Sequence, residues 1–204
     1  MAYDFNGTNQ YLSTSSAPAQ ANSTTIACWY RVSNASIRQA LVSLSDAVGN
    51  LNRHLLYHES SARVSIATGG ALESNSAVVV PSNTWTHGAG VWNASNSRYV
   101  YANGTQSVNF TSNVSVSTFD RVEIGRRPST LYLAGNIAEV GIWNAALTAA
   151  EVASLAKGMT CDKIRPQNLV FYAPLVRDLN DQKGGLAITN NNGATVANHP
   201  RVYA

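Results

Sequence analysis

The chain has 204 residues, of which only 12% are charged, whereas an ordinary soluble domain carries about 25%. Its formal net charge is +3, and its 14 lysines and arginines form no basic stripe interleaved with aromatic residues, which argues against nucleic-acid binding. No apolar run approaches the length of a membrane span, and the first residues lack the pattern of a signal peptide, so we expect neither membrane insertion nor secretory export.

Short extended segments separated by polar turns make up the first half of the chain. The pair Asn103–Gly104 is the strongest hairpin signal, because it accepts the positive φ values of a type I′ turn. Such regular spacing indicates a β-sandwich or jelly roll rather than alternating strands and helices. The predicted strands lie within residues 2–12, 25–33, 38–45, 55–57, 63–67, 77–80, 85–92, 98–102 and 105–110.

The segment 135–157 combines a strand with a helix. Residues 137–143 are apolar or β-branched apart from one acidic residue, and they predict a strand buried on at least one face. Apolar residues then recur at helical spacing, with Thr148 as the N-cap and Glu151 three residues later, as a capping box requires. The pattern predicts one short helix over about 148–157.

Glu139 is the acidic residue inside that strand. Ile137 and Val140 would fall on opposite faces of a regular strand, so we expect an inserted residue, a β-bulge, beside Glu139. A bulge would re-aim the carboxylate. We interpret Glu139 as a buried or half-buried side chain hydrogen-bonded to the backbone rather than as a catalytic group.

From residue 161 onward the sequence pattern differs from that of the preceding residues, and it predicts an extended tail. It contains too few apolar residues to fold alone, so it would either return to the sandwich as extra edge strands or reach a neighbouring subunit. We interpret Cys28 as a small buried hydrophobe. A disulfide between Cys28 and Cys161 is an open alternative that the spacing does not decide.

Five landmarks carry a family resemblance, and they occur at Phe5–Leu12, Ile26–Trp29, Trp85–His87, Tyr99–Gly104 and Gly135–Val152. In this order they resemble the laminin-G-like domains of the concanavalin A-like jelly-roll superfamily. The resemblance covers roughly residues 2–158. It implies an all-β, two-sheet antiparallel jelly-roll sandwich over residues 1–160, and the change in the sequence after it marks residues 161–204 as a C-terminal extension.

The carboxylates form no recognisable catalytic pattern. Glycoside hydrolysis needs two carboxylates about 5 to 9.5 Å apart, and the nearest pair, Asp120 and Glu123, has an odd offset that places them on opposite faces of a strand. His54 and His58 are four residues apart and lack a third ligand, so zinc is not expected. We predict no catalytic residue, no cofactor-binding residue and no metal ligand.

Calcium is the metal that the resemblance suggests, because many laminin-G-like domains bind it at the rim of the sandwich. Asp46 and Asp120 lie at predicted rim turns, and Asp178 and Asp181 form the one close acidic pair. We interpret this pair as turn residues before a Gly-Gly sequence. Calcium needs about six to eight oxygen ligands, so we do not expect calcium-dependent binding.

Aromatic residues could serve packing or sugar stacking. We expect the four tryptophans, which lie inside predicted strands, to be core residues, whereas four tyrosines could be exposed on the concave face and stack on sugar rings. The tryptophans are Trp29, Trp85, Trp92 and Trp143, and the tyrosines are Tyr57, Tyr99, Tyr101 and Tyr132.

We interpret the loop Arg126–Thr130 as a solvated protrusion and His87 as a structural residue.

Three functions are compatible with such a domain, since the superfamily hosts lectins, adhesion modules, virion proteins and glycosidases. We favour a non-enzymatic virion accessory protein, such as a bacteriophage capsid decoration or a head or tail surface protein. It would contact other virion proteins as a homo-oligomer or in a capsid lattice on the virion surface. The alternative is a glycan-binding module for attachment to cell-surface polysaccharide, with an extracellular or cell-surface location. A glycosidase is disfavoured because the carboxylate pair is missing.

Overall fold

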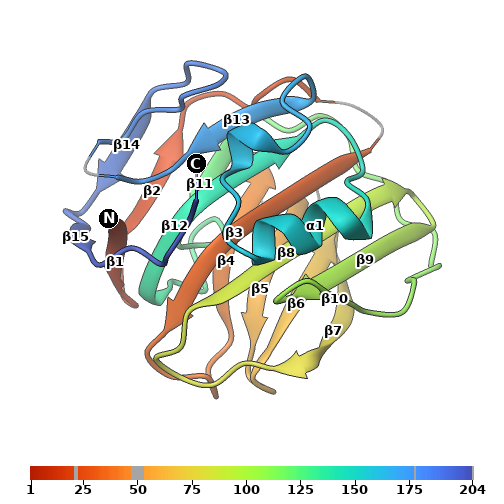
Figure 1. The fold of residues 1–204 in the computed structure, drawn as a ribbon, viewed down its shortest axis with the longest axis horizontal. Helices are drawn as coiled ribbons and strands as arrows, with labels where there is room; N and C mark the ends of the chain where they lie inside the picture. The colour runs from red at the N-terminus through yellow and green to blue at the C-terminus, as the bar shows by residue number, and fades with distance from the viewer. Residues whose placement is uncertain (21–22, 47–52, 177, 204) are drawn as a thin grey trace.

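In the part of the chain that the structure describes, the protein is a sandwich of two antiparallel sheets with one short α-helix on its outer surface (Figure 1). The computed structural model describes residues 1–20, 23–46, 53–176 and 178–203, and the backbone alone for 71–74. This architecture confirms the all-β jelly-roll prediction. None of the helices in the described part is long and apolar enough to span a membrane.

The eight-stranded sheet consists, in spatial order, of β10 (Thr105–Gln106), β9 (Ser97–Ala102), β8 (Thr86–Ala94), β3 (Thr24–Val32), β12 (Ala134–Trp143), β1 (Ala2–Asn6) and β15 (Thr195–Ala197), with β13 (Leu169–Ala173) also paired to β12. The seven-stranded sheet consists of β14 (Ile188–Asn191), β2 (Tyr11–Thr14), β11 (Arg121–Ile124), β4 (Gln39–Ser45), β5 (Arg53–Glu59), β6 (Arg63–Thr68) and β7 (Ala71–Val79).

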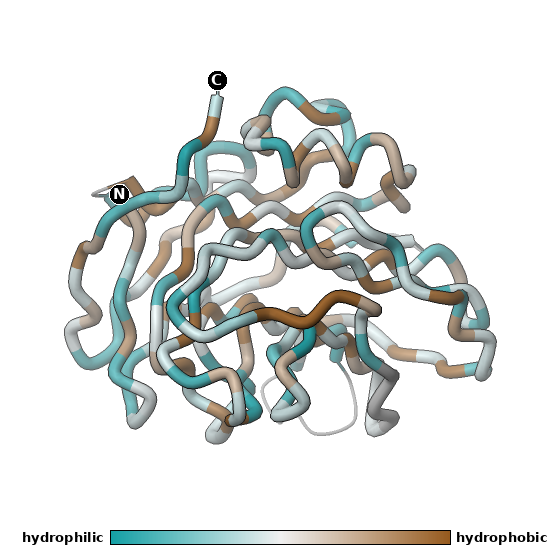
Figure 2. Tube along the Cα trace, turned by 60° about the horizontal axis from the view of Figure 1, so that its bottom comes forward, coloured by the Kyte–Doolittle hydropathy of each residue, from teal (hydrophilic) through white to brown (hydrophobic). Residues whose placement is uncertain are grey.

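The main core lies between the two sheets. Alternate residues of β5 and β6, such as Leu56 and Ile66, point inward and are fully buried, as a period of two requires. Gly90 on β8 allows close packing at this level, because a Cβ there would lie 2.7 Å from both Ile66 Cγ2 and Trp92 Cη2. Figure 2 shows hydrophobic stretches along the layered strands and hydrophilic stretches at most of the turns.

The strand β12 is the centre of the eight-stranded sheet. It pairs with β3 along one side, and along the other side with β1 through its first half and with β13 through its second half. The register with β3 shifts between Ala138 and Gly141, and Glu139 between them has a φ of 52°. The predicted bulge beside Glu139 is therefore confirmed.

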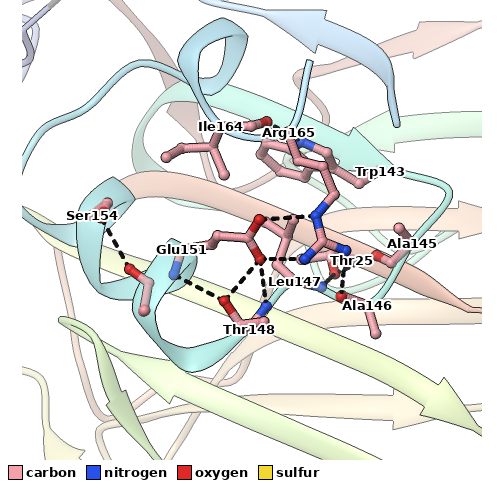
Figure 3. Close-up of polar contacts among 11 residues, drawn as sticks. Thr25, Trp143, Ala145, Ala146, Leu147, Thr148, Glu151, Ser154, Ile164 and Arg165 are labelled. Carbon is pink, nitrogen blue, oxygen red and sulfur yellow. Dashed lines mark hydrogen bonds and ion pairs between the residues drawn. The ribbon is translucent and has the colours of Figure 1, made fainter. Parts of the chain in front are cut away.

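The helix α1 (Ala149–Ala156) begins where the capping residues predict. Thr148 Oγ1 accepts a hydrogen bond from the Glu151 backbone N–H at 3.3 Å, and Glu151 Oε2 accepts one from the Thr148 N–H at 2.7 Å (Figure 3). Arg165, which follows the short 3₁₀ helix η1 (Cys161–Lys163), donates to both oxygens of Glu151 at 2.8 and 2.6 Å. This bidentate ion pair fixes the start of α1 against the chain that follows it.

A second apolar cluster lies on the outer face of the eight-stranded sheet, beneath α1. Val152 and Leu155 of the helix are buried there against Trp143 and Tyr101. The Trp143 Nε1–H donates to the Ile164 carbonyl oxygen at 2.8 Å (Figure 3). The helix thus covers one side of the sandwich and stabilises it by burying apolar surface.

The C-terminal segment returns to the sandwich, since β13, β14 and β15 pair with β12, β2 and β1. Asp181 stabilises the turn after β13: Oδ1 accepts from the backbone N–H groups of Tyr172, Lys183 and Gly184, and Oδ2 from that of Leu186. The prediction that Asp181 is a turn residue is therefore confirmed.

The two cysteines are free. Cys28 points into the core between the sheets, whereas Cys161 lies in the cluster beneath α1, on the outer side of the same sheet. Because the sheet separates the two thiols, they do not form the disulfide left open above. Cys28 is fully buried, as predicted.

Other sequence predictions need local correction. The hairpin at Asn103–Gly104 is confirmed, with φ values of 48° and 79°. The strand predicted over 105–110 is shorter, because β10 ends at Gln106 and only an isolated bridge joins Phe110 to Arg98. β11 (Arg121–Ile124) is not among the strand ranges predicted above, although Asp120 and Glu123 were assigned there to opposite faces of a strand.

Candidate functional site

A cleft of about 720 Å³ lies at one end of the sandwich. Its walls come from strand ends that meet there, because Trp92 on β8 pairs with Arg98 on β9, and His54 on β5 pairs with Thr68 on β6. The irregular segment 114–119 closes the remaining side. The cleft is lined by Gln20, His54, Thr68, Trp92, Asn93, Ala94, Ser95, Arg98, Val114, Ser115, Val116, Ser117, Thr118 and Phe119.

Three aromatic rings form the floor of the cleft. The His54 imidazole stacks on the Trp92 indole with centroids 4.5 Å apart and an interplanar angle of 9°, and Phe119 lies 5.0 Å from His54 at 59°. The Trp92 Nε1–H donates to Thr68 Oγ1 at 2.7 Å. All three rings are held by packing inside the end of the sandwich, so the floor is apolar and fixed in place.

His54 is neutral at physiological pH. Its burial, and secondarily the positive charge of Arg98, lowers the pKa of the imidazole to about 3. Its Nδ1 has no hydrogen-bond partner within the described residues. The floor of the cleft therefore contains an uncharged ring rather than an imidazolium cation.

Arg98 fixes one end of the wall formed by the segment 112–119. Its guanidinium, which is fully buried, donates from Nη2 to the Ser112 carbonyl oxygen at 2.7 Å and to Ser112 Oγ at 2.9 Å, and from Nη1 to the Ser95 carbonyl oxygen. The Ser95 carbonyl also accepts the Val114 N–H at 3.0 Å. These bonds tie the wall to the turn between β8 and β9.

Gln20 fixes the other end of that wall. Its amide donates from Nε2 to the Phe119 carbonyl oxygen at 2.8 Å and accepts the Phe119 N–H through Oε1 at 2.8 Å. Between these two anchor points, the side chains of Ser115, Ser117 and Thr118 are exposed at the cleft. The wall is thus held at both ends and presents polar groups between them.

The chemistry available in the cleft is that of binding. Hydroxyl and amide side chains line its rim, and aromatic rings line its floor, which is the combination that small-molecule sites use. Among the described lining residues none is a carboxylate, so general acid and base residues for glycoside hydrolysis are not supplied by this lining.

A family model of the concanavalin A-like lectin/glucanase superfamily matches residues 6–153. The chain belongs to this superfamily. No curated protein matches its sequence.

Solved structures place this superfamily member among several jelly-roll proteins. A native heptameric SAP-like pentraxin from Limulus polyphemus aligns with a TM-score of 0.70 and 17% identity over 95% of this chain and 93% of its own. A proposed carbohydrate-binding protein from Bacteroides ovatus gives a TM-score of 0.71 and 17% identity over 95% of this chain and 58% of its own. The CBM40 domain of the Ruminococcus gnavus IT-sialidase, bound to α2,3-sialyllactose, gives a TM-score of 0.56 and 13% identity over 76% of this chain and 98% of its own. At these identities the likeness shows the fold.

The carboxylates singled out from the sequence do not face one another in this concanavalin A-like chain. Asp120 is exposed and pairs with Arg121 Nε at 2.8 Å, whereas Glu123 is buried on β11 and pairs with Arg126 Nη2 at 2.7 Å. Neither lines the cleft. Within the described residues no group of three histidine, cysteine or acidic side chains is arranged to hold a metal ion.

The histidines occupy separate environments. His58 lies at the other end of β5 from His54, where Nδ1 is 3.2 Å from the Tyr30 hydroxyl and Nε2 is 2.9 Å from the Ala35 carbonyl oxygen. His87 is buried on β8 with its ring edge-on to Trp29, 5.5 Å between centroids, in keeping with a structural role.

Glu139 is buried, as predicted, but its partners are side chains rather than backbone groups. The Tyr172 hydroxyl donates to Glu139 Oε2 at 2.7 Å, and His199 Nε2 lies 3.3 Å from Glu139 Oε1. The bulge turns the carboxylate outward from the sheet toward β13 and the C-terminal segment, which a regular strand would not do.

The aromatic predictions are partly wrong. Tyr57 and Tyr101 are buried, because the first packs beneath Leu131 and the second lies in the cluster beneath α1. Of the tryptophans predicted to be core residues, two are buried and two are half-buried. The buried tryptophans are Trp92 and Trp143, and the half-buried ones are Trp29 and Trp85. The other two tyrosines, Tyr99 and Tyr132, are also half-buried.

The loop at residues 126–130 is not a free protrusion. The Arg126 guanidinium lies 3.3 Å from the centroid of the Tyr11 ring and also bonds to Glu123, so the loop is held against the seven-stranded sheet. The prediction of a solvated loop is therefore wrong for its first residue. Arg126 is held against the sheet because its guanidinium makes both a cation–π contact and an ion pair.

Sequence reasoning missed most of the cleft. It assigned Trp92 to the core and considered His54 only as a metal ligand, and it did not single out Phe119, Arg98 or Gln20. These residues come from distant parts of the chain, and only the strand order brings them together. The signal available in the sequence was the run of small polar residues over 111–118, which is typical of a surface segment.

Proposed function

We propose that this chain is a glycan-binding module without catalytic activity and that its ligand occupies the cleft at the end of the sandwich. The observation that carries the proposal is a cleft of about 720 Å³ with an aromatic floor and a rim of hydroxyl and amide groups. Sugar rings present apolar C–H faces and polar hydroxyl edges. The exposed rim groups can bond to the hydroxyl edges, whereas the floor rings are at most 8% exposed, so an apolar face would also meet the half-buried Val114 and Val116 of the wall.

The comparisons support the same function. The sialidase CBM40 is bound to a sialylated glycan and the Bacteroides protein is described as carbohydrate-binding, and both share this fold. They favour the glycan-binding alternative over the virion accessory role that we expected from the sequence. The chain spans 58% of the Bacteroides protein, so the activity of that whole protein is not transferred.

A blocking variant tests whether the cleft is the binding site. Ser115 is exposed at the cleft, so Ser115→Trp would place a large ring in its mouth. Ser36→Trp is the matched control, because Ser36 is an exposed serine beside Ala35, near the opposite end of β5. We expect a glycan array to detect ligands for the wild type and the control and to lose them for Ser115→Trp.

The array is read with calcium and with a chelator. Binding that persists in the chelator agrees with the lack of a metal site among the described residues. The proposal fails if the wild type binds no glycan in either condition, or if Ser115→Trp binds as well as the control does.

Association of several copies would strengthen such a module. The pentraxin with the same fold is heptameric, and we extend the sequence-based expectation of a homo-oligomer to a multivalent glycan binder. Several clefts on one particle raise the effective affinity for a repeating glycan without any new contact. Light scattering of the intact chain measures this, and a monomer at micromolar concentration would contradict it.

A further inference from the structure

We propose that the outer face of the eight-stranded sheet carries a second binding site, which takes an uncharged pyranose unit of a polysaccharide. Two tryptophans and a row of three polar side chains form this site, which we call the outer platform. Its members are Trp29, Trp85, Asp4, Arg31 and Asn136. The inference goes beyond the function proposed above, because the platform lies elsewhere on the chain and binds its ligand independently of the cleft.

The strand registers bring the polar row of the platform together on one face. Arg31 on β3 is paired with Asn136 on β12, and Asn136 is paired with Asp4 on β1. Their neighbours in the sequence, such as Tyr30 and Ile137, belong to the core between the sheets. Because side chains alternate across a strand, the residues of the row point away from that core, toward the outer surface.

The two tryptophans of the platform are half-buried and keep an unused hydrogen-bond donor. The Arg31 guanidinium lies over the Trp85 ring, 5.8 Å from its centroid. Within the described residues, the indole N–H groups of Trp29 and Trp85 have no hydrogen-bond partner, whereas those of Trp92 and Trp143 do. A partly exposed indole offers apolar surface to the C–H groups of a sugar and an N–H to one of its hydroxyls.

Hydrogen bonds hold the polar row in place and leave both of its ends available. Arg31 Nε donates to Asn136 Oδ1 at 2.9 Å, and Asn136 Nδ2 donates to Asp4 Oδ1 at 2.7 Å. Asn136 is buried, so it fixes the guanidinium and the carboxylate relative to each other. In the part of the chain that the structure describes, the Nη groups of Arg31 and Oδ2 of Asp4 have no hydrogen-bond partner.

The two ends of the row suit a neutral ligand that is rich in hydroxyl groups. A guanidinium only donates hydrogen bonds and a carboxylate only accepts them, whereas a sugar hydroxyl does both. Because the formal charges of Arg31 and Asp4 cancel, a charged ligand would be attracted at one end and repelled at the other. A neutral pyranose can bond to both ends, and hydrogen bonds to charged groups are about twice as strong as neutral ones.

The platform and the cleft lie at opposite ends of β8. Trp85 directly precedes this strand and Trp92 lies near its end, about 23 Å farther along the chain direction, where it points into the sandwich. A polysaccharide bound at one site therefore leaves the other open, so one protein molecule can contact two polysaccharide strands. The platform is a surface rather than a cleft, and we expect a dissociation constant on the order of 1 to 10 mM. Binding this weak does not survive the washing of a glycan array, so it leaves the test of the cleft unchanged.

The indole signals of a ¹H–¹⁵N NMR spectrum test the platform, because the four tryptophans report on separate places. Trp29 and Trp85 report on the platform, and the variants Trp29→Phe and Trp85→Phe assign their signals. Trp92 reports on the cleft, and Trp143 on the cluster beneath α1. We suggest titration with linear hexasaccharides of glucose, mannose and galactose to about 20 mM, above the expected dissociation constant. Sorbitol, which has hydroxyl groups and no pyranose ring, is the control.

We expect the signals of Trp29 and Trp85 to shift with at least one hexasaccharide and not with sorbitol, and the signal of Trp143 to stay in place. Two aspartate variants provide a matched comparison. Asp4→Asn removes the charged acceptor and keeps an oxygen for the hydrogen bond from Asn136, whereas Asp120→Asn removes the same charge from an exposed position beside β11. Asp4→Asn should weaken the binding by about threefold or more, and Asp120→Asn should leave it unchanged. An unchanged Trp143 signal shows that each variant is folded.

The outcomes separate the platform from the cleft. The platform is refuted if neither Trp29 nor Trp85 responds to any hexasaccharide, if sorbitol shifts both signals equally, or if the two aspartate variants weaken binding alike. These results would leave the cleft proposal standing, because the cleft is read by Trp92 and by the Ser115→Trp array. Shifts of Trp29 and Trp85 that persist in Ser115→Trp would establish the platform even if the cleft bound no glycan.

Discussion

Replacing His54 with phenylalanine tests the electrostatics of the cleft floor. Burial, and then the charge of Arg98, lowers the pKa of His54 from 6.5 to about 3. At pH 5 the ring is therefore neutral in the folded protein, whereas the unfolded chain binds a proton there. Because the unfolded state binds more protons, the stability contribution is fully present above pH 6.5 and is lost as the pH falls toward 3.

The size of the effect follows from these two pKa values. Between pH 7 and pH 5, His54 alone should lower the free energy of unfolding by about 2 kcal/mol. His87 is also fully buried, and burial lowers its pKa to about 3, so it should add a decrease of similar size. Phenylalanine does not titrate, and its ring can keep the stacking on Trp92.

Urea unfolding at pH 7 and pH 5 measures these changes by linear extrapolation. We expect the decrease between the two pH values to be about 2 kcal/mol smaller for His54→Phe than for the wild type, and about 4 kcal/mol smaller for the double variant with His87→Phe. His87→Phe alone is the control for a histidine away from the cleft. If His54→Phe shows the full wild-type decrease, His54 titrates normally in the folded protein, and our account of the floor is refuted.

Substitutions at three further positions test other parts of the fold. Gly90→Ala places a Cβ 2.7 Å from Trp92 Cη2, so we expect a loss of about 1 to 3 kcal/mol in urea unfolding and a shifted tryptophan emission. Glu139→Ala leaves the buried Tyr172 hydroxyl without its acceptor and should cost about 1 to 3 kcal/mol, measured as a lower Tm, whereas Glu139→Gln should cost less. Asp181→Ala removes the acceptor for four backbone N–H groups, and hydrogen exchange after β13 should accelerate, whereas unchanged exchange would contradict the assigned role.

Local patterns in the sequence predicted the parts of the fold that depend on neighbours along the chain. Thr148 and Glu151 predicted the start of the helix because a capping box is a local motif. Asn103–Gly104 predicted its hairpin because the turn needs two adjacent residues with positive φ. The bulge at Glu139 was predicted because its flanking apolar residues could not share one face.

The cleft could not be predicted in the same way. His54, Trp92 and Phe119 are brought together by strand order and by a wall without regular structure, and no periodicity in the sequence encodes either feature. Arg98 was missed for a related reason. The fully buried Arg98 depends on the backbone carbonyl oxygens of Ser95 and Ser112, and the sequence does not record where those carbonyls point.

Both ends of the described chain lie on the far side of the sandwich from the cleft. β1 and β15 are neighbours at one edge of the eight-stranded sheet, whereas the strands that reach the cleft, β8 and β9, lie toward the other edge (Figure 1). A tag, a surface linkage or another domain attached at either end would therefore leave the mouth of the cleft facing solution. Immobilised on a sensor chip through one end, the protein should capture a soluble polysaccharide as readily as it does when free.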